Sequence, residues 1–76
     1  MHSSSRSPEK LTAAETTVAH YLREGWTNKE ISLQLNKSEG TVKIQVAAIL
    51  RKLGVRTRGR AAAELRDRMS MVVSLA

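Results

Sequence analysis

Residues 38–54 hold the pattern that most limits how this chain can fold. Four aliphatic residues recur there at the period of an α-helix that buries one face, and they are Val42, Val46, Ile49 and Leu53. Ser38 before the run is a favoured N-cap, and Gly54 after it suits a left-handed stop. The sequence therefore predicts a helix over 39–53 with one buried face and one exposed face.

Two capping boxes upstream predict where two further helices begin. In Thr12-Ala13-Ala14-Glu15 the first and last side chains can satisfy each other's backbone amides, and Thr27-Asn28-Lys29-Glu30 repeats the pattern. Gly25 is placed to end the first helix. The second helix is short, and a tight turn at Asn36-Lys37 joins it to the 39–53 helix. Two helices joined by so brief a turn form a helix-turn-helix.

A fourth helix is expected downstream, with Thr57 as its N-cap and Arg58 near its start. Residues 70–76 are more apolar than a free tail should be. They are interpreted as continuation of the helix, as the cut end of a longer chain, or as a dimer contact. The serine-rich residues 1–10 are expected to be a flexible linker or cloning remnant, so the folded domain is predicted to span 11–69. The expected fold is all-α, with four helices.

The expected core combines an apolar stripe from each helix. A small residue in the second helix lets helices approach closely, and the single tryptophan is expected to pack across the turn after the first helix. The expected core residues outside the 39–53 helix are Ala14, Val18, Tyr21 and Leu22, then Trp26, Ile31, Ser32 and Leu35, and finally Ala61, Ala62, Leu65 and Met69.

The charge balance favours a polyanionic partner. The chain has 13 Lys and Arg residues against 7 Asp and Glu residues, which gives a formal net charge of +6 and a pI near 10.6. The stretch 51–60 contains no acid and holds Arg51, Lys52, Arg56, Arg58 and Arg60. Such a run is also common on an ordinary solvated surface, so charge alone assigns no function.

Other residue types exclude several function classes. The absence of cysteine rules out disulfides, zinc fingers and thiol nucleophiles, and it fits the reducing cytoplasm where we expect the protein. No apolar run reaches the ~18 residues that cross a membrane, and the N-terminus is not a secretory signal. His2 and His20 are too far apart for a metal site, and the glycines match no phosphate loop. We therefore expect no enzyme, no metal and no cofactor.

The exposed side of the 39–53 helix suits the major groove of DNA. A helix in that groove needs short or apolar side chains near base edges and cations that reach guanine. Lys43 can donate to guanine, Ile44 can contact a thymine methyl, and Ala47 permits close approach. An exposed isoleucine is also common on ordinary surfaces. We predict that these three residues contact bases.

Phosphates of the DNA backbone are expected to be held by residues around that helix. The first turns of the second and third helices offer free amides to an anion, and the basic run can extend the grip. The predicted phosphate or edge contacts are Lys29, Thr41, Gln45, Arg51, Arg56 and Arg58.

Four pieces of sequence carry a family resemblance. They are Leu11-Thr12-x-x-Glu15, Gly25-x-x-Asn28-Lys29-Glu30-Ile31, Ser38-x-x-Thr41-Val42-Lys43 and Lys52-Leu53-Gly54-Val55-x-x-Arg58-x-x-Ala61. In this order and spacing they resemble the LuxR-type DNA-binding domain, also called GerE-like or FixJ/NarL-type. The resemblance covers residues 11–68.

The resemblance implies a bacterial transcription regulator whose third helix enters the major groove of double-stranded DNA. It also implies a homodimer on inverted half-sites that forms through the fourth helix. The candidate dimer contacts are Leu65, Met69 and Val72. RNA polymerase is a further partner that the resemblance leaves open.

Five positions depart from the family pattern. Relatives usually have Arg at Ala14, Ala at Ser32, a β-branched apolar residue at Lys37, His at Gln45 and often a cation at Ala47. Gln45 can still hydrogen-bond a phosphate or an adenine edge. Lys37 either loosens the turn or adds a phosphate contact.

Three alternatives stay open. The 38–43 segment also resembles the recognition helix of sigma-factor region four, although the pieces at 28–31 and 52–55 favour the LuxR type. A protein-interaction module would instead dock a partner on the fourth helix and the apolar tail. RNA binding is weaker, because Tyr21 and Trp26 are the only aromatic rings available for base stacking.

Overall fold

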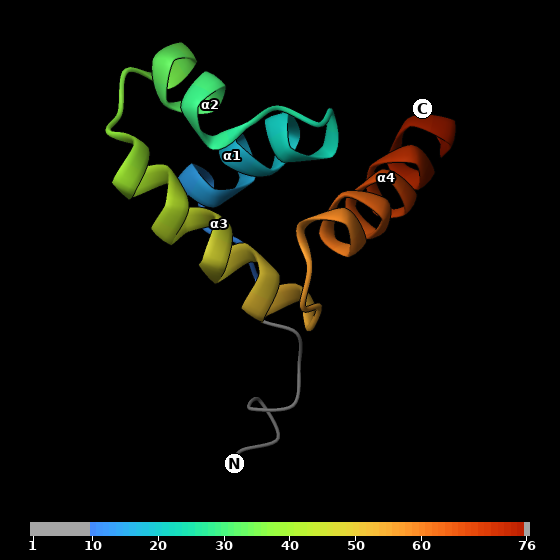
Figure 1. The fold of residues 1–76 in the computed structure, drawn as a ribbon. Coiled ribbons are helices and arrows are strands. Elements are labelled where there is room, and N and C mark those ends of the chain that lie inside the picture. The colour runs from blue at the N-terminus through green and yellow to red at the C-terminus, as the bar shows by residue number, and fades with distance from the viewer. Residues whose placement is uncertain (1–9, 76) are drawn as a thin grey trace.

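The computed structural model describes residues 10–75, with side chains described as far as residue 68. The chain forms four helices, and the described range contains no strand (Figure 1). They are α1 (Ala13–Arg23), α2 (Asn28–Leu35), α3 (Glu39–Leu53) and α4 (Arg58–Leu75). The all-α prediction is confirmed. Helix α4 continues through residue 75. The apolar residues 70–75 are therefore a continuation of the helix, as the first of the three interpretations expected.

The first three helices begin where their caps predict. Thr12 Oγ1 accepts from the Glu15 amide at 3.1 Å, and the Glu15 carboxylate accepts from the Thr12 amide at 2.9 Å. The same reciprocal pair forms between Thr27 and Glu30 at 3.1 and 2.8 Å. Ser38 Oγ accepts from the amide of residue 41 at 3.0 Å. These local bonds satisfy amides that would otherwise lack partners, so they set the register of each helix.

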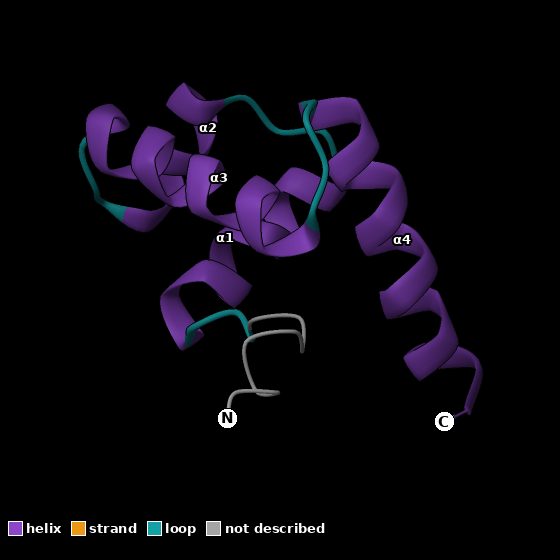
Figure 2. Cartoon of the chain, turned by 90° about the horizontal axis from the view of Figure 1, so that it is seen from below, coloured by secondary structure: helices purple, strands orange, loops and turns teal. Residues whose placement is uncertain are grey.

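Residues in the left-handed region end two of these helices. Asn36 caps α2 at φ 57°, and Gly54 caps α3 at φ 74°. Asparagine and glycine tolerate this conformation better than other residues. The turn between α2 and α3 is therefore only Asn36 to Ser38 long, which makes the pair a helix-turn-helix (Figure 2).

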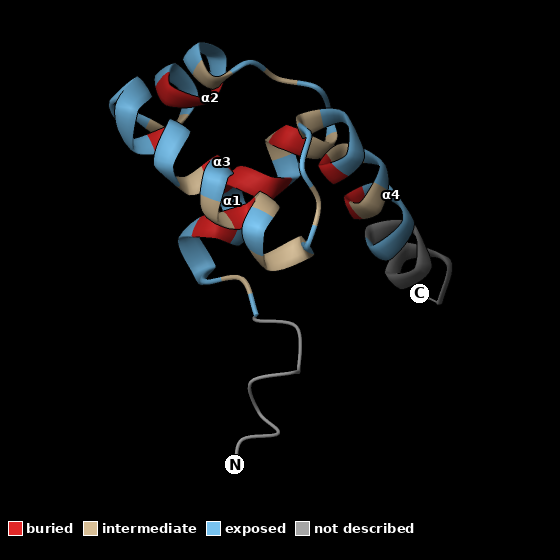
Figure 3. Cartoon of the chain, turned by 60° about the horizontal axis from the view of Figure 1, so that its bottom comes forward, coloured by how far each residue is buried: buried red, intermediate tan, exposed pale blue. Residues whose placement is uncertain are grey.

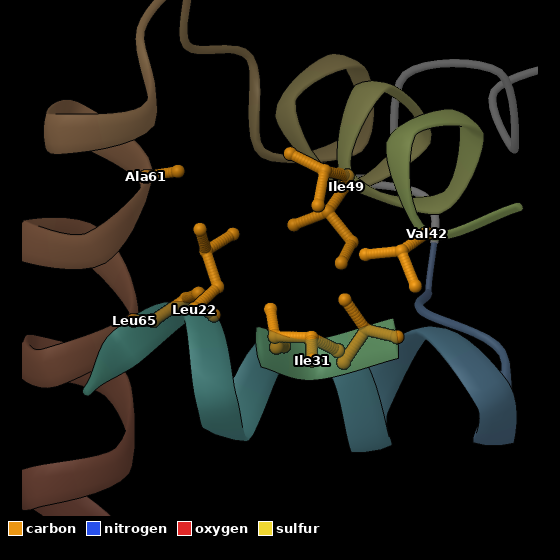
Figure 4. Packing of buried hydrophobic residues seen from close by; sticks show 9 residues of the cluster. Leu22, Ile31, Val42, Ile49, Ala61 and Leu65 are labelled. Atoms are coloured by element: carbon orange, nitrogen blue, oxygen red, sulfur yellow. The ribbon is translucent and has the colours of Figure 1, made fainter. Parts of the chain in front are cut away.

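A single hydrophobic core joins the four helices. Residues buried in it are concentrated where α1, α2 and α3 meet (Figure 3), and α4 packs against α1 and α3 from one side. In Figure 4, Ala61 and Leu65 of α4 face the cluster around Leu22. The core consists of Val18, Ala19, Leu22, Ile31, Val42, Val46, Ile49, Ala61 and Leu65. The predicted inner face of α3 is confirmed, with Leu53 half-buried at its end.

One predicted core residue is wrong. Ala14 is exposed, whereas Ala19, which was not predicted, is fully buried. The buried positions of α1 are 15, 18, 19 and 22. This i, i+3, i+4, i+7 stripe leaves Ala14 at its solvent edge.

The first turn of α4 has a hydrogen-bonded N-cap and is joined by hydrogen bonds to the start of α2 and the turn before it. Thr57 Oγ1 accepts from the Arg60 amide at 3.1 Å, as its predicted role as N-cap requires. The Arg58 guanidinium donates to Asn28 Oδ1 at 2.7 Å and to the Trp26 carbonyl. Trp26 in turn packs against Tyr21 with ring centroids 4.7 Å apart. The start of α4 is therefore fixed to the turn that precedes α2.

Candidate DNA-binding face

Four residues form the outer face of α3, and they are Lys43, Ile44, Ala47 and Arg51. All four are exposed, and Ile44 keeps 72% of its surface accessible. They lie opposite the buried Val42, Val46 and Ile49, so the side of α3 that is turned away from the core is mostly pale blue in Figure 3. The three residues predicted to contact bases are thus side by side on one helical surface.

An ion pair between the ends of two helices fixes the far end of α3. Lys52 Nζ lies 2.7 Å from Glu15 Oε1, and each side chain is only 11% exposed. The Lys52 ammonium, together with the Thr12 amide, holds the pKa of the Glu15 carboxyl below its ordinary value of 4.5. Lys52 Nζ also reaches the carbonyl of Lys10 at 3.4 Å. These contacts connect the last turn of α3 to the first turn of α1.

This ion pair was not predicted from the sequence. Glu15 already had a role in the capping box, and Lys52 was one member of a basic run. One feature of the sequence could have indicated that Lys52 faces the core. Lys52 lies three residues after the buried Ile49, which places it at the edge of the inner face of α3.

The first turn of α3 presents a hydroxyl group. Ser38 Oγ accepts from the Thr41 amide and donates to Thr41 Oγ1 at 2.8 Å. The hydroxyl hydrogen of Thr41 remains able to donate outward, and the residue is exposed. This arrangement suits an anion near the N-terminus of the helix.

Two of the positions that depart from the family pattern contact each other. Lys37 Nζ donates to Gln45 Oε1 at 3.3 Å, and both residues are half-buried. Gln45 therefore lies beside the outer face of α3, between that face and the turn after α2. The sequence predicts a phosphate or edge contact for Gln45 and leaves a phosphate contact open for Lys37, but it does not predict that the two residues contact each other.

The remaining predicted phosphate contacts fall into two groups. Lys29 at the start of α2 and Arg56 before α4 are exposed. Arg58 is half-buried and holds Asn28 and the Trp26 carbonyl, so part of its guanidinium is already engaged within the chain. A guanidinium has five donors, and those left over can still bind an anion.

The predicted dimer contacts lie at different depths on α4. Leu65 is only 2% exposed and packs in the core of its own chain, which leaves no accessible side chain there for a second copy. The side chains of Met69 and Val72 lie outside the described residues. A contact between two copies of α4 would therefore depend on those later positions.

Within the described residues there is no group of three or more His, Cys, Asp or Glu side chains placed to hold a metal ion. No helix of the described chain is long and apolar enough to cross a membrane.

Comparison with known proteins gives a family match. The sequence model described as "Bacterial regulatory proteins, luxR family" matches residues 9–65. This span includes α1, α2, α3 and the first part of α4.

Three curated relatives match part of the chain. The nitrate/nitrite response regulator protein NarP of Escherichia coli (strain K12) is 50% identical over 48 residues, which cover 63% of this chain and 22% of that protein. A nitrate/nitrite response regulator protein homolog of Haemophilus influenzae is 42% identical over 50 residues, 66% of this chain and 24% of the relative. The glycerol metabolism activator of Pseudomonas putida is also 42% identical over 50 residues, 66% of this chain and 23% of that protein. The match spans less than a quarter of each relative.

Proposed function

Because the chain belongs to the luxR family of bacterial regulatory proteins, we propose that it binds specific sequences of duplex DNA with α3 in the major groove. One observation carries the proposal: Lys43, Ile44 and Ala47 are exposed together on a helix whose opposite face is buried. The names of the relatives, two response regulators and an activator, support a role in transcription.

The outer face of α3 has the chemistry that base edges require. A major groove about 12 Å wide admits one α-helix. Lys43 can donate to the O6 and N7 acceptors of guanine, and Ile44 can contact the methyl group of thymine. Ala47 is short, so the helix axis can come close to the bases. The tie between Lys52 and Glu15 holds this face in one orientation.

Phosphate contacts would flank the groove on both sides of α3. Thr41 offers its hydroxyl at the N-terminus of the helix, and Lys29 offers a charge at the start of α2. Arg51, Arg56 and Arg58 extend the positive surface toward the C-terminus. In this proposal, Arg58 also positions the start of α2 by holding Asn28.

Salt dependence tests the proposal for DNA binding. If some five cations neutralise phosphates, the slope of log affinity against log salt should be roughly −4 to −5, at about 0.9 per phosphate. The measurement is fluorescence anisotropy of a labelled duplex across a range of salt concentrations. A slope near zero would contradict a binding mode that depends on phosphate contacts.

A homodimer on inverted half-sites is part of the same proposal, with Met69 and Val72 of α4 as its candidate contacts. Two copies would read half-sites one or more helical turns apart, so the spacing of the bases reports the dimer geometry. Selection of bound sites from random duplex should return two inverted half-sites at a fixed spacing. A single half-site without a partner would contradict the dimer but leave DNA binding intact.

The luxR-family match supports this proposal over the sigma-factor region four alternative. A protein-interaction module is the alternative of another class, in which α4 binds a protein and the charge only aids solubility. The two differ in a gel shift on nonspecific duplex at low salt, because only the DNA-binding proposal predicts retardation. The proposal also includes a cytoplasmic location and RNA polymerase as a further partner.

A further inference from the structure

The contact between Lys37 and Gln45 defines which atoms of Gln45 face outward. An ammonium has three donors and no acceptor, so it can bind only the oxygen of the Gln45 amide. The observed bond, from Nζ to Oε1 at 3.3 Å, has this polarity. The amide oxygen is therefore held toward the turn, and the NH₂ group points away from it.

We propose that Lys37 orients the Gln45 amide so that Gln45 donates to a DNA phosphate and does not read an adenine edge. The inference rests on the proposed function and concerns the part that these two residues play in it. Lys37 is a positioning residue, because it acts through Gln45.

Reading adenine would need both polar atoms of the amide. A glutamine that recognises adenine accepts from N6 with its oxygen and donates to N7 with its nitrogen. The oxygen of Gln45 already faces an ammonium, whose positive charge repels a second donor hydrogen. Only the NH₂ group is left for a partner, and that partner must be an acceptor.

The neighbours of Gln45 also favour a phosphate. Thr41 precedes Gln45 by one helical turn, so the two side chains lie on the same side of α3. The Thr41 hydroxyl already accepts from Ser38, so its own hydrogen can be donated. Thr41, Gln45 and the Lys37 charge therefore offer two donors and a cation. A phosphate oxygen, which only accepts, complements this set.

The test combines affinity with base selection in four proteins: the wild type, Lys37→Met, Gln45→Leu and the double variant. Methionine keeps the apolar stem of Lys37 and removes its ammonium, and thermal unfolding checks that each variant is folded. We expect Lys37→Met to weaken the affinity for nonspecific duplex both in the wild type and in Gln45→Leu. The loss of affinity should be about fivefold larger in the wild type, which is a coupling typical of side chains in contact. We also expect Lys37→Met to gain an adenine preference at one position, which neither the wild type nor the double variant shows.

Two controls separate positioning from charge or folding. Lys37→Arg keeps a cation beside the amide and should keep the base preference of the wild type. Lys29→Met removes an exposed cation that does not contact Gln45, so its effect should be the same with or without Gln45.

Three results would overturn the inference. The effects of Lys37→Met and Gln45→Leu could be independent, the adenine preference could be absent from Lys37→Met, or the wild type could itself select adenine through Gln45. In each case the wild type still binds duplex, so the proposed function stands. A wild type that binds no duplex would contradict both.

Discussion

Lys43 and Lys52 belong to the same helix and carry the same charge, yet the fold uses them in opposite ways. They are nine residues apart, about two and a half turns of α3, so they point to opposite sides. Lys52 is nearly buried and is paired with Glu15 at 2.7 Å. Lys43 is exposed and makes no hydrogen bond or ion pair with any described residue. One lysine holds the helix in place, and the other is available to a ligand.

The basic stretch 51–60 contains the same two kinds of cation. Arg58 in that stretch has partners on α2 and in the turn before it, whereas Arg56 is exposed. Position relative to the core, rather than charge, therefore decides which cations serve the fold and which are available to DNA.

The largest effect is expected from a charge on the inner face. Val46→Asp buries a carboxylate without a partner, which costs about 3–5 kcal/mol, against a total stability of about 4–11 kcal/mol for a domain of this size. We expect the midpoint of thermal unfolding, followed by helical circular dichroism, to fall by about 12 °C or more, because 1 kcal/mol corresponds to about 4–8 °C in a domain of this size.

Ala47→Asp is the matched control, because the neighbouring position is exposed. It should unfold at nearly the wild-type temperature but bind DNA poorly, since it sets a negative charge against the groove. Cooperative unfolding of Val46→Asp at the wild-type temperature would mean that the two faces of α3 are reversed.

A smaller loss of stability is expected when the ion pair is broken. Glu15→Gln keeps the capping geometry but removes the charge that Lys52 faces, and hydrogen bonds to charged groups contribute about 1.5–3 kcal/mol. Urea unfolding at neutral pH should show this loss. Lys52→Met should cost a similar amount, and the double variant should cost less than the sum.

The same pair predicts an acid dependence. Because folding lowers the pKa of the Glu15 carboxyl, its contribution is complete above the ordinary value of 4.5 and is lost as the pH falls through the lowered value. Glu15→Gln should remove this part of the acid destabilisation. An identical difference between wild type and variant at pH 7 and at pH 2 would contradict the assignment.

Lys43→Ala should leave stability almost unchanged, within about 0.5 kcal/mol, as expected of an exposed position. Its effect should appear in binding, where loss of a base contact costs about 1–3 kcal/mol on the selected site. Lys29→Ala is the comparison, because loss of a phosphate contact weakens all sequences alike and reduces the salt slope by about one. Equal losses on specific and nonspecific DNA for Lys43→Ala would make it a phosphate contact instead.

Most of the fold follows from local signals in the sequence. The pairs Thr12 with Glu15 and Thr27 with Glu30 are three residues apart, so capping chemistry locates their helices without knowledge of the rest. The left-handed ends at Asn36 and Gly54 are local in the same way. The inner face of α3 followed from the helical period alone.

Contacts between distant residues did not follow from the sequence. Glu15 and Lys52 are 37 positions apart, and Asn28 and Arg58 are 30 apart, so their pairing depends on how the helices cross. No periodic pattern in the sequence indicates which of these distant residues will pair. Whether Ala14 is buried or exposed depends on how α1 is rotated about its own axis against the core. An alanine fits either environment, so its identity does not fix that rotation.

The central claim is that the outer face of α3, rather than another exposed surface, lies in the major groove. The chain has no cysteine, so Ile44→Cys and Leu33→Cys each introduce a single thiol. They are well matched, because Ile44 on α3 is 72% exposed and Leu33 on α2 is 73% exposed. Each variant is incubated with the selected duplex, in which a base in the major groove carries a tether that ends in a mixed disulfide, so that the cysteine thiolate displaces a small thiol by exchange. We predict that Ile44→Cys forms a disulfide with the duplex in high yield and Leu33→Cys does not, and equal or reversed yields would contradict the account.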